Sequence, residues 1–209
     1  SAEEIAANPH FSDDAPGGIR IVDTNNDGSL TPEDRVALGT PYPDFTWGIT
    51  NTFQIKDFDI SFLIQGVQGI TVLNGDVYYN ETKKWNKKYT KNRWVSAEHP
   101  GDGKTPYQNV KTGHDLMLTD YPLQNASYAC LRNFTVGYTL PATAARKIKL
   151  SGVRFYVSGS NLLYIWGSGY KGINPESRMT SGNYSSAMIS GYQRGGFPLT
   201  STISAGFDI

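Results

Sequence analysis

The sequence has one cysteine, three histidines and no long apolar run. Cys130 alone excludes both an internal disulfide and a thiolate metal cluster. No stretch of about 18 apolar residues occurs, which excludes a transmembrane helix. Residues 1–10 lack the cationic segment and apolar core of a signal peptide, so for an exported protein we expect the natural N-terminus to lie upstream.

Net charge and catalytic motifs are also missing. The 19 basic residues equal the 19 acidic residues, so no field attracts nucleic acid, and we expect no nucleic-acid partner. His10, His99 and His114 are scattered and have no His or Cys at zinc spacing. Gly101 to Lys104 resembles a turn rather than a phosphate loop, because no apolar strand precedes it and no helix follows. The sequence therefore does not predict an enzyme.

What the sequence does have is alternation with period two. Five segments show it, namely 45–55, 58–65, 133–140, 153–158 and 199–209. One face of each segment is rich in Phe, Ile and Val, whereas the other face is mostly Thr, Ser, Gly, Asn and Gln. These segments predict antiparallel β-strands. The polar faces suit a water-filled lumen, although a soluble β-sandwich with one wet face alternates in the same way.

The connections between these segments alternate in length. Only Lys56 and Asp57 separate the first two segments, which predicts a tight hairpin, and residues 141–147 form another short link. Long loops span 69–125 and 167–196. A short, long, short, long order is typical of an up-and-down barrel with one elaborate rim. Four aromatic side chains near strand ends are candidates for an interfacial girdle: Phe45, Trp47, Tyr138 and Tyr164.

The segment 199–209 runs to the last residue without a polar tail. Its pattern approximates the insertion signal of outer-membrane barrels, which ends on an aromatic residue two positions beyond that of Ile209. We therefore expect residues to follow Ile209. If the C-terminus is periplasmic, counting strands places both short turns in the periplasm and the long loops, with the segment before residue 45, outside the cell.

The acidic loop 23–34 has the spacing of an EF-hand calcium loop. Gly28 is at position 6, where the chain turns sharply. Asp34 stands at position 12, where the longer Glu is usual, and an Asx-rich turn without an ion is the alternative. We predict structural calcium, held by the oxygens of five residues: Asp23, Asn25, Asp27, Ser29 through its carbonyl, and Asp34.

The long loops are rich in aromatic residues, which can stack on sugars. Ordinary loop packing is the alternative. The candidates for contact with substrate or with a lid protein are Tyr78, Tyr79, Trp85, Trp94, Trp166 and Tyr170.

An ordered set of motifs resembles the C-terminal region of the SusC-like (SusC/RagA-type) TonB-dependent outer-membrane transporters. The resemblance spans nearly the whole chain. Each motif is weak by itself, but the order and spacing of the set are specific. The motifs are Asp23 to Leu30 with Asp34-Arg35, Gly39 to Gly48, Phe58 to Phe62 with Gln65-Gly66, Leu131 to Pro141, Val153 to Leu162, and Phe197 to Thr200.

This resemblance implies an all-β fold, with the five segments forming the C-terminal antiparallel strands of a large, 22-stranded transmembrane β-barrel. Residues 1–44 would then be an extracellular loop with the calcium motif, and residues 45–209 barrel strands. The resemblance also implies a plug and N-terminal strands elsewhere in the same barrel, energy from TonB, a SusD-like surface lipoprotein, and import of oligosaccharides or peptides. The predicted surroundings are outer-membrane lipid of a Gram-negative bacterium.

Two other classes of protein remain open from the residues alone. One is a secreted, calcium-stabilised β-sandwich that binds glycans, and the other is a structural surface protein or adhesin. Neither plug nor TonB box occurs in this sequence, and five strands cannot close a barrel. Under the resemblance to the transporters, we therefore expect the chain to be part of a larger protein.

Overall fold

The computed structural model describes residues 1–75, 91–107, 119–177, 191–193 and 196–209. The chain divides into two compact units. One unit combines residues 1–41, 71–124 and 178–196, and the other combines residues 42–70, 125–177 and 197–209. Each unit is therefore assembled from segments that are far apart in the sequence.

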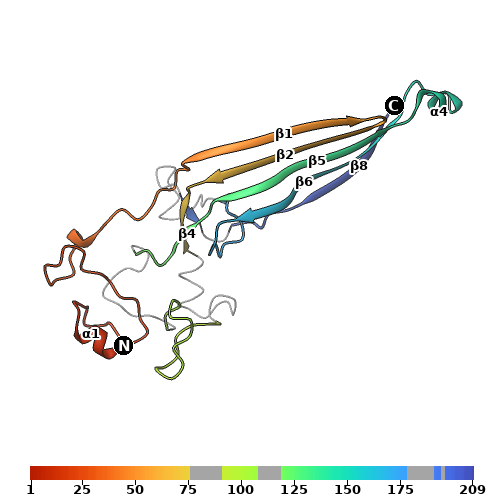
Figure 1. Cartoon of the computed structure of the whole chain (residues 1–209). Coiled ribbons are helices and arrows are strands. Elements are labelled where there is room, and N and C mark those ends of the chain that lie inside the picture. Colours follow the sequence, from red (N-terminus) through yellow and green to blue (C-terminus); the bar gives the residue numbers. More distant parts are fainter. Residues whose placement is uncertain (76–90, 108–118, 178–190, 194–195) are drawn as a thin grey trace. The chain divides into compact units, whose positions relative to one another are not determined.

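The second unit is a five-stranded antiparallel sheet in which neighbours along the chain are neighbours in space, in the order β1-β2-β5-β6-β8 (Figure 1). This meander confirms the predicted all-β class and the five predicted strands. The strands are β1 (Phe45–Ile55), β2 (Phe58–Gln68), β5 (Tyr128–Thr139), β6 (Arg154–Trp166) and β8 (Thr202–Asp208).

Register places the apolar residues of all five strands on one face. Phe53 pairs with Ile60, which pairs with Val136 on its other side. Val136 in turn pairs with Val157, and Val157 pairs with Ala205. Because directly paired residues point to the same side of a sheet, this row crosses the sheet on a single face. The opposite face carries rows such as Thr52, Ser61, Thr135, Ser158 and Ser204.

A β-bulge at Arg132 keeps that face continuous. The pairing with β2 jumps from Leu63–Asn133 to Ile64–Leu131, so Arg132 is an extra residue in β5. One extra residue reverses the alternation. Leu131 therefore lies on the same face as Phe134, although one position is odd and the other is even. Without the bulge, the first part of β5 would turn its apolar side chains to the polar face.

Strand lengths differ from the sequence-based expectation. β5 begins at Tyr128 and β6 continues to Trp166, whereas the alternation predicted strands at 133–140 and 153–158. The irregular pairing around Arg132 and Asn161 interrupts the period, which hides the outer half of both strands. β8 begins at Thr202 rather than at residue 199, because its ladder with β6 ends at the pair Ser160–Thr202.

Both short connections lie at one end of the sheet, together with the end of β8. Ile55 pairs with Phe58 across the first turn, and Thr139 pairs with Arg154 across the second. Arg154 also pairs with Asp208 (Figure 1). The second connection contains a short helix, α4 (Ala142–Lys147), which the sequence did not reveal. The predicted sorting of short and long connections to opposite ends is confirmed.

The described residues of the first unit contain little regular structure. It has the short helix α1 (Ala2–Ala6), the turn η1 (Pro32–Asp34) and most of a small sheet of β4 (Leu123–Asn125), β3 (Thr71–Asn74) and β7 (Tyr192–Gln193). β3 and β7 pair in parallel, and Val72 of β3 is fully buried. Within the described residues, no helix is long and apolar enough to cross a membrane.

Candidate functional site

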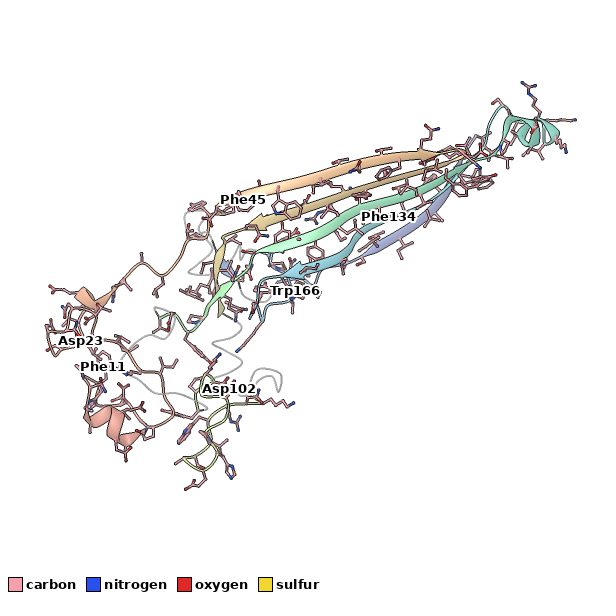
Figure 2. The ribbon with its side chains drawn as sticks, viewed as in Figure 1. Phe11, Asp23, Phe45, Asp102, Phe134 and Trp166 are labelled. Atoms are coloured by element: carbon pink, nitrogen blue, oxygen red, sulfur yellow. The ribbon has the colours of Figure 1, made fainter. Side chains whose placement is uncertain are left out.

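The apolar face of the main sheet is exposed along its length. Phe45 is 57% exposed at one end of β1, Phe155 is 50% exposed on β6, and Ile203 is 74% exposed on β8. A β-sandwich would cover such a face with a second sheet. Phe45 and Phe134, labelled in Figure 2, belong to this face. A continuous apolar surface of this kind marks an interaction with an apolar partner or with lipid.

The opposite face carries an ordered polar cluster centred on Arg132. Its Nη1 donates to Asn161 Oδ1 at 2.7 Å and to the Tyr164 hydroxyl at 2.8 Å. Nη2 forms an ion pair with Glu176 Oε1 at 2.5 Å. The Gln65 carboxamide also faces the guanidinium, and with its oxygen turned toward Arg132 it accepts from Nε at 3.1 Å and from Nη2 at 2.6 Å. Side chains from the two neighbouring strands, β2 and β6, and from one loop thus converge on one guanidinium group of β5.

This cluster corrects one prediction from the sequence. Tyr164 pairs with Cys130 and bonds to Arg132, so it lies on the polar face and does not belong to an aromatic girdle facing lipid. Its parity in β6 is opposite to that of Leu163, which is exposed on the apolar face. Phe45, Trp47 and Tyr138 do lie on the apolar face.

A second charged cluster lies on the polar face at the end with the short turns. Arg154 donates to both Asp59 oxygens, at 2.9 and 2.6 Å, and to Asp208 Oδ2 at 3.1 Å. The guanidinium reaches Asp59 by passing over β5 at Gly137, where an added Cβ would lie 2.3 Å from Asp59 Oδ1. Ionic contacts of Arg154 thus join β6 to β2 and to β8, and the contact with β2 passes over Gly137 of β5.

The predicted calcium loop is tightly wrapped by its own side chains. Asp23 accepts from the backbone N–H of Asn26 at 2.7 Å and of Gly28 at 2.9 Å. Asn25 and Asp27 accept from backbone N–H groups two residues further on. Asn26 and Gly28 both have positive φ, 61° and 86°, which turns the chain back on itself. The side-chain oxygens of Asp23, Asn25 and Asp27 therefore bind backbone N–H groups of this one short loop, in which Figure 2 labels Asp23.

Asp34 has a different environment. It is 9% exposed, and its carboxylate accepts from Thr31 N–H and Thr24 N–H, both at 2.8 Å. These backbone donors, Thr31 first, hold the pKa of the Asp34 carboxyl below its usual range. Among the described residues, no group of three or more His, Cys, Asp or Glu side chains is arranged to hold a metal. The predicted ligand set depends on amide and carbonyl oxygens as well as carboxylates.

The loop aromatics are found in three situations. Tyr78, Tyr79 and Trp85 lie outside the described residues. Trp94 packs against Gly17, whose added Cβ would lie 2.2 Å from the indole, and lines a pocket with Arg20 and Lys104.

Trp166 and Tyr170 are neighbours at the end of β6, with ring centroids 6.1 Å apart. Trp166 is 43% exposed and Tyr170 is 8% exposed. Trp166 is therefore the one that presents more surface to a ligand.

The candidate site residue that the sequence did not reveal is Arg132. Its position in the Leu131 to Pro141 motif gave no hint of a bulge, and its ionic partner Glu176 is in a distant loop. A lone Arg directly before the alternating segment 133–140 was the only available signal.

No protein-family model matches the chain. Over its whole length it is 30% identical to TonB-dependent receptor P26 of Formosa agariphila, and 94% of it is 30% identical to TonB-dependent receptor P3 of that bacterium. It is 28% identical over 75% of its length to TonB-dependent receptor SusC of Bacteroides thetaiotaomicron. The chain spans about a fifth of the length of the first two relatives, 21% and 19%.

The fold is similar to that of solved transporters. The RagAB peptide importer in its 'closed-closed' state matches 92% of the chain, with a TM-score of 0.64 and 19% identity, and the match covers 20% of that structure's chain. The RagAB peptide transporter matches 81% of the chain, with a TM-score of 0.61 and 20% identity.

An exposed apolar face, a polar opposite face and a meander of neighbouring strands define a segment of a membrane β-barrel. The sequence relatives make the assignment specific. The chain belongs to the SusC-like TonB-dependent receptors, of which it represents a C-terminal segment.

Proposed function

We propose that the chain forms part of the barrel wall of an outer-membrane importer for oligosaccharides or peptides. The observation that carries this proposal is the two-faced sheet, with an exposed apolar face for lipid and a polar face for a water-filled interior. Similarity over the whole chain to receptors supports the proposal, and these relatives are named as receptors and importers, which points away from an enzyme.

Growth on defined nutrients tests this function. Deleting the gene from its host should abolish growth on one class of polymer, either a glycan or a protein digest, and restoring the gene should restore growth. Free monosaccharides and amino acids serve as the control, because they do not require a large importer. Unimpaired growth of the deletion strain on every glycan and peptide source tested would contradict the proposal.

Within such an importer, the chain needs partners that it does not contain. The outer edges of β1 and β8 have no neighbouring strand among the described residues. We propose that the remaining strands of a 22-stranded barrel pair with them, since open edges are not tolerated in lipid. The complete importer also comprises a plug, TonB and a SusD-like lipoprotein. Copurification of a surface lipoprotein with the full-length receptor tests the last of these partners.

For orientation, we propose that the C-terminus and both short turns face the periplasm and the long loops face outward. The clustering of the turns with the end of β8 supports this arrangement. A cysteine at Ser168, labelled with an impermeant maleimide on intact cells, should react, whereas a cysteine at Lys56 should not. Labelling of Lys56→Cys on intact cells would reverse the orientation.

We also propose that the loop 23–34 binds structural calcium through Asp23, Asn25, Asp27, the Ser29 carbonyl and Asp34. The EF-hand spacing of these residues and the reversal of the chain at Gly28, whose φ is 86°, support it.

Chelation should expose this loop to protease, and added calcium should restore protection. Asp27→Asn should weaken protection, whereas Asp13→Asn, outside the loop, should not. Identical cleavage with and without chelator would favour an ion-free Asx turn.

A further inference from the structure

The Glu176 side chain makes an unusual contact for a loop residue. It follows β6 in the segment 167–177, yet its Oε1 meets Arg132 of β5 at 2.5 Å and accepts from the Tyr164 hydroxyl at 2.9 Å. The Arg132 and Glu176 side chains are 20% and 30% exposed. This is therefore a half-buried, charge-assisted contact rather than a surface ion pair.

The strands supply only neutral groups to the same guanidinium. Asn161, Tyr164 and Gln65 each present an oxygen to Arg132. Among the described residues, Glu176 is the carboxylate paired with Arg132. The planar guanidinium group and an adjacent hydroxyl donor form an arrangement that binds carboxylates. The sheet thus presents a carboxylate site, and the loop supplies the carboxylate.

The segment 167–177 is also held by contacts that precede Glu176 along the chain. At its start, Gly167 N–H donates to the Ser127 carbonyl at 2.7 Å, and Tyr170 is buried. Near its end, Pro175 is fully buried, and Asn174 Nδ2 donates to the Phe197 carbonyl at 3.1 Å. Of the contacts named here, the one between Glu176 and Arg132 is ionic. The group best suited to replace the Glu176 carboxylate is therefore another carboxylate.

We propose that Arg132 and Tyr164 form a carboxylate-binding subsite on the polar face that Glu176 fills from within the chain, so that a ligand carboxylate competes with the segment 167–177. A peptide C-terminus and an acidic sugar share the required chemistry. Binding of such a group releases the end of the segment from the wall. The inference rests on the proposed function only in that the polar face must be open to solute.

The test uses the purified full-length receptor in detergent with Glu176→Gln, which keeps the shape of the side chain and removes its charge. The probe is acetyl-alanine, with acetyl-alanine amide as its uncharged match, and saturation-transfer NMR reports binding. We expect about tenfold more signal from the acid in Glu176→Gln than in the parent receptor, within the range of measured couplings between sites. The amide should give no signal above background in either protein.

Three further variants separate the site from general effects of charge. Asp208→Asn removes a carboxylate from Arg154 on the same face, but Arg154 keeps Asp59, so this control should not gain acetyl-alanine binding. Adding Arg132→Gln to Glu176→Gln should abolish the gain. If that variant does not fold, as judged by its gel mobility without boiling, adding Tyr164→Phe instead should reduce the gain by removing one donor.

Two results would overturn the proposal. One is equal binding of the acid and the amide to Glu176→Gln, and the other is an equal gain in Asp208→Asn. Because binding is measured without transport, failure of the uptake experiment would leave these outcomes unaffected. A spin label at Ser177→Cys, next to Glu176, gives an independent readout, and we expect acetyl-alanine to increase its mobility in a receptor that otherwise has the parent sequence. An unchanged spectrum at saturating acetyl-alanine would argue against displacement of the segment.

Discussion

At the scale of single residues, Gly137 shows how the polar face accommodates a cross-strand ionic contact. Arg154 Nη2 would lie 2.5 Å from an added Cβ at this position, and Asp59 Oδ1 would lie 2.3 Å from it. Any side chain would therefore push apart the ion pair that passes over the strand. Here the absence of a Cβ is what matters, because no positive φ is involved.

We expect Gly137→Ala to destabilise the folded receptor by about 1 kcal/mol, the upper range for a partly exposed ion pair. In an Arg154→Ala background the same change should cost much less, because the contact is already lost. The temperature at which the compact band disappears on gels gives the order of stability. Gly152→Ala is the matched control, since an added Cβ there meets nothing within 4 Å. Additive losses in the double variant would contradict this account.

At the scale of elements, the β1–β2 hairpin depends on one residue with left-handed backbone. Lys56 has a φ of 55°, and the following strand starts at Phe58. Two-residue hairpin turns need positive φ to match the twist of the strands. Lysine tolerates this conformation at some cost, and a β-branched residue tolerates it poorly.

Lys56→Gly should therefore stabilise the receptor by up to about 1 kcal/mol, and Lys56→Val should destabilise it by about 1 kcal/mol or more. The measurement is the urea concentration at the midpoint of unfolding from detergent micelles. Gln54→Val, at an extended position of the same hairpin, should be neutral or better. If Lys56→Val were as stable as the parent, the turn would not have the conformation described.

At the scale of the whole molecule, the five-stranded sheet has an exposed apolar face and two open edges in the part of the chain that the structure describes. An exposed apolar face is unfavourable in water, and open strand edges are unfavourable in lipid. The sheet is therefore part of a barrel wall, and its stability depends on further strands that pair with β1 and β8.

We expect the full-length receptor to require detergent and to migrate faster on gels before boiling than after it. The isolated chain 1–209 should show no such compact band, because β1 and β8 lack partners. A protein that is soluble without detergent and runs identically before and after boiling would contradict the barrel assignment.

The sequence by itself determined the five strands of the main sheet, which of their faces is apolar and which of their connections are short. These properties are local: alternation in β2, for example, is set by residues two apart, such as Phe58 and Ile60. Membership in the receptor family also came from the order of motifs, each of them a short stretch of neighbouring residues.

Only the tertiary structure decided the features that join distant residues. The bulge at Arg132 appeared once Leu131 had to pair with Ile64. The parallel pair of β3 and β7 joins two long loops, and the Arg132–Glu176 contact joins a strand to a loop beyond its neighbour. A local period in the sequence does not encode such contacts, because they join residues that are far apart along the chain. They form only when the strands pair in their final register.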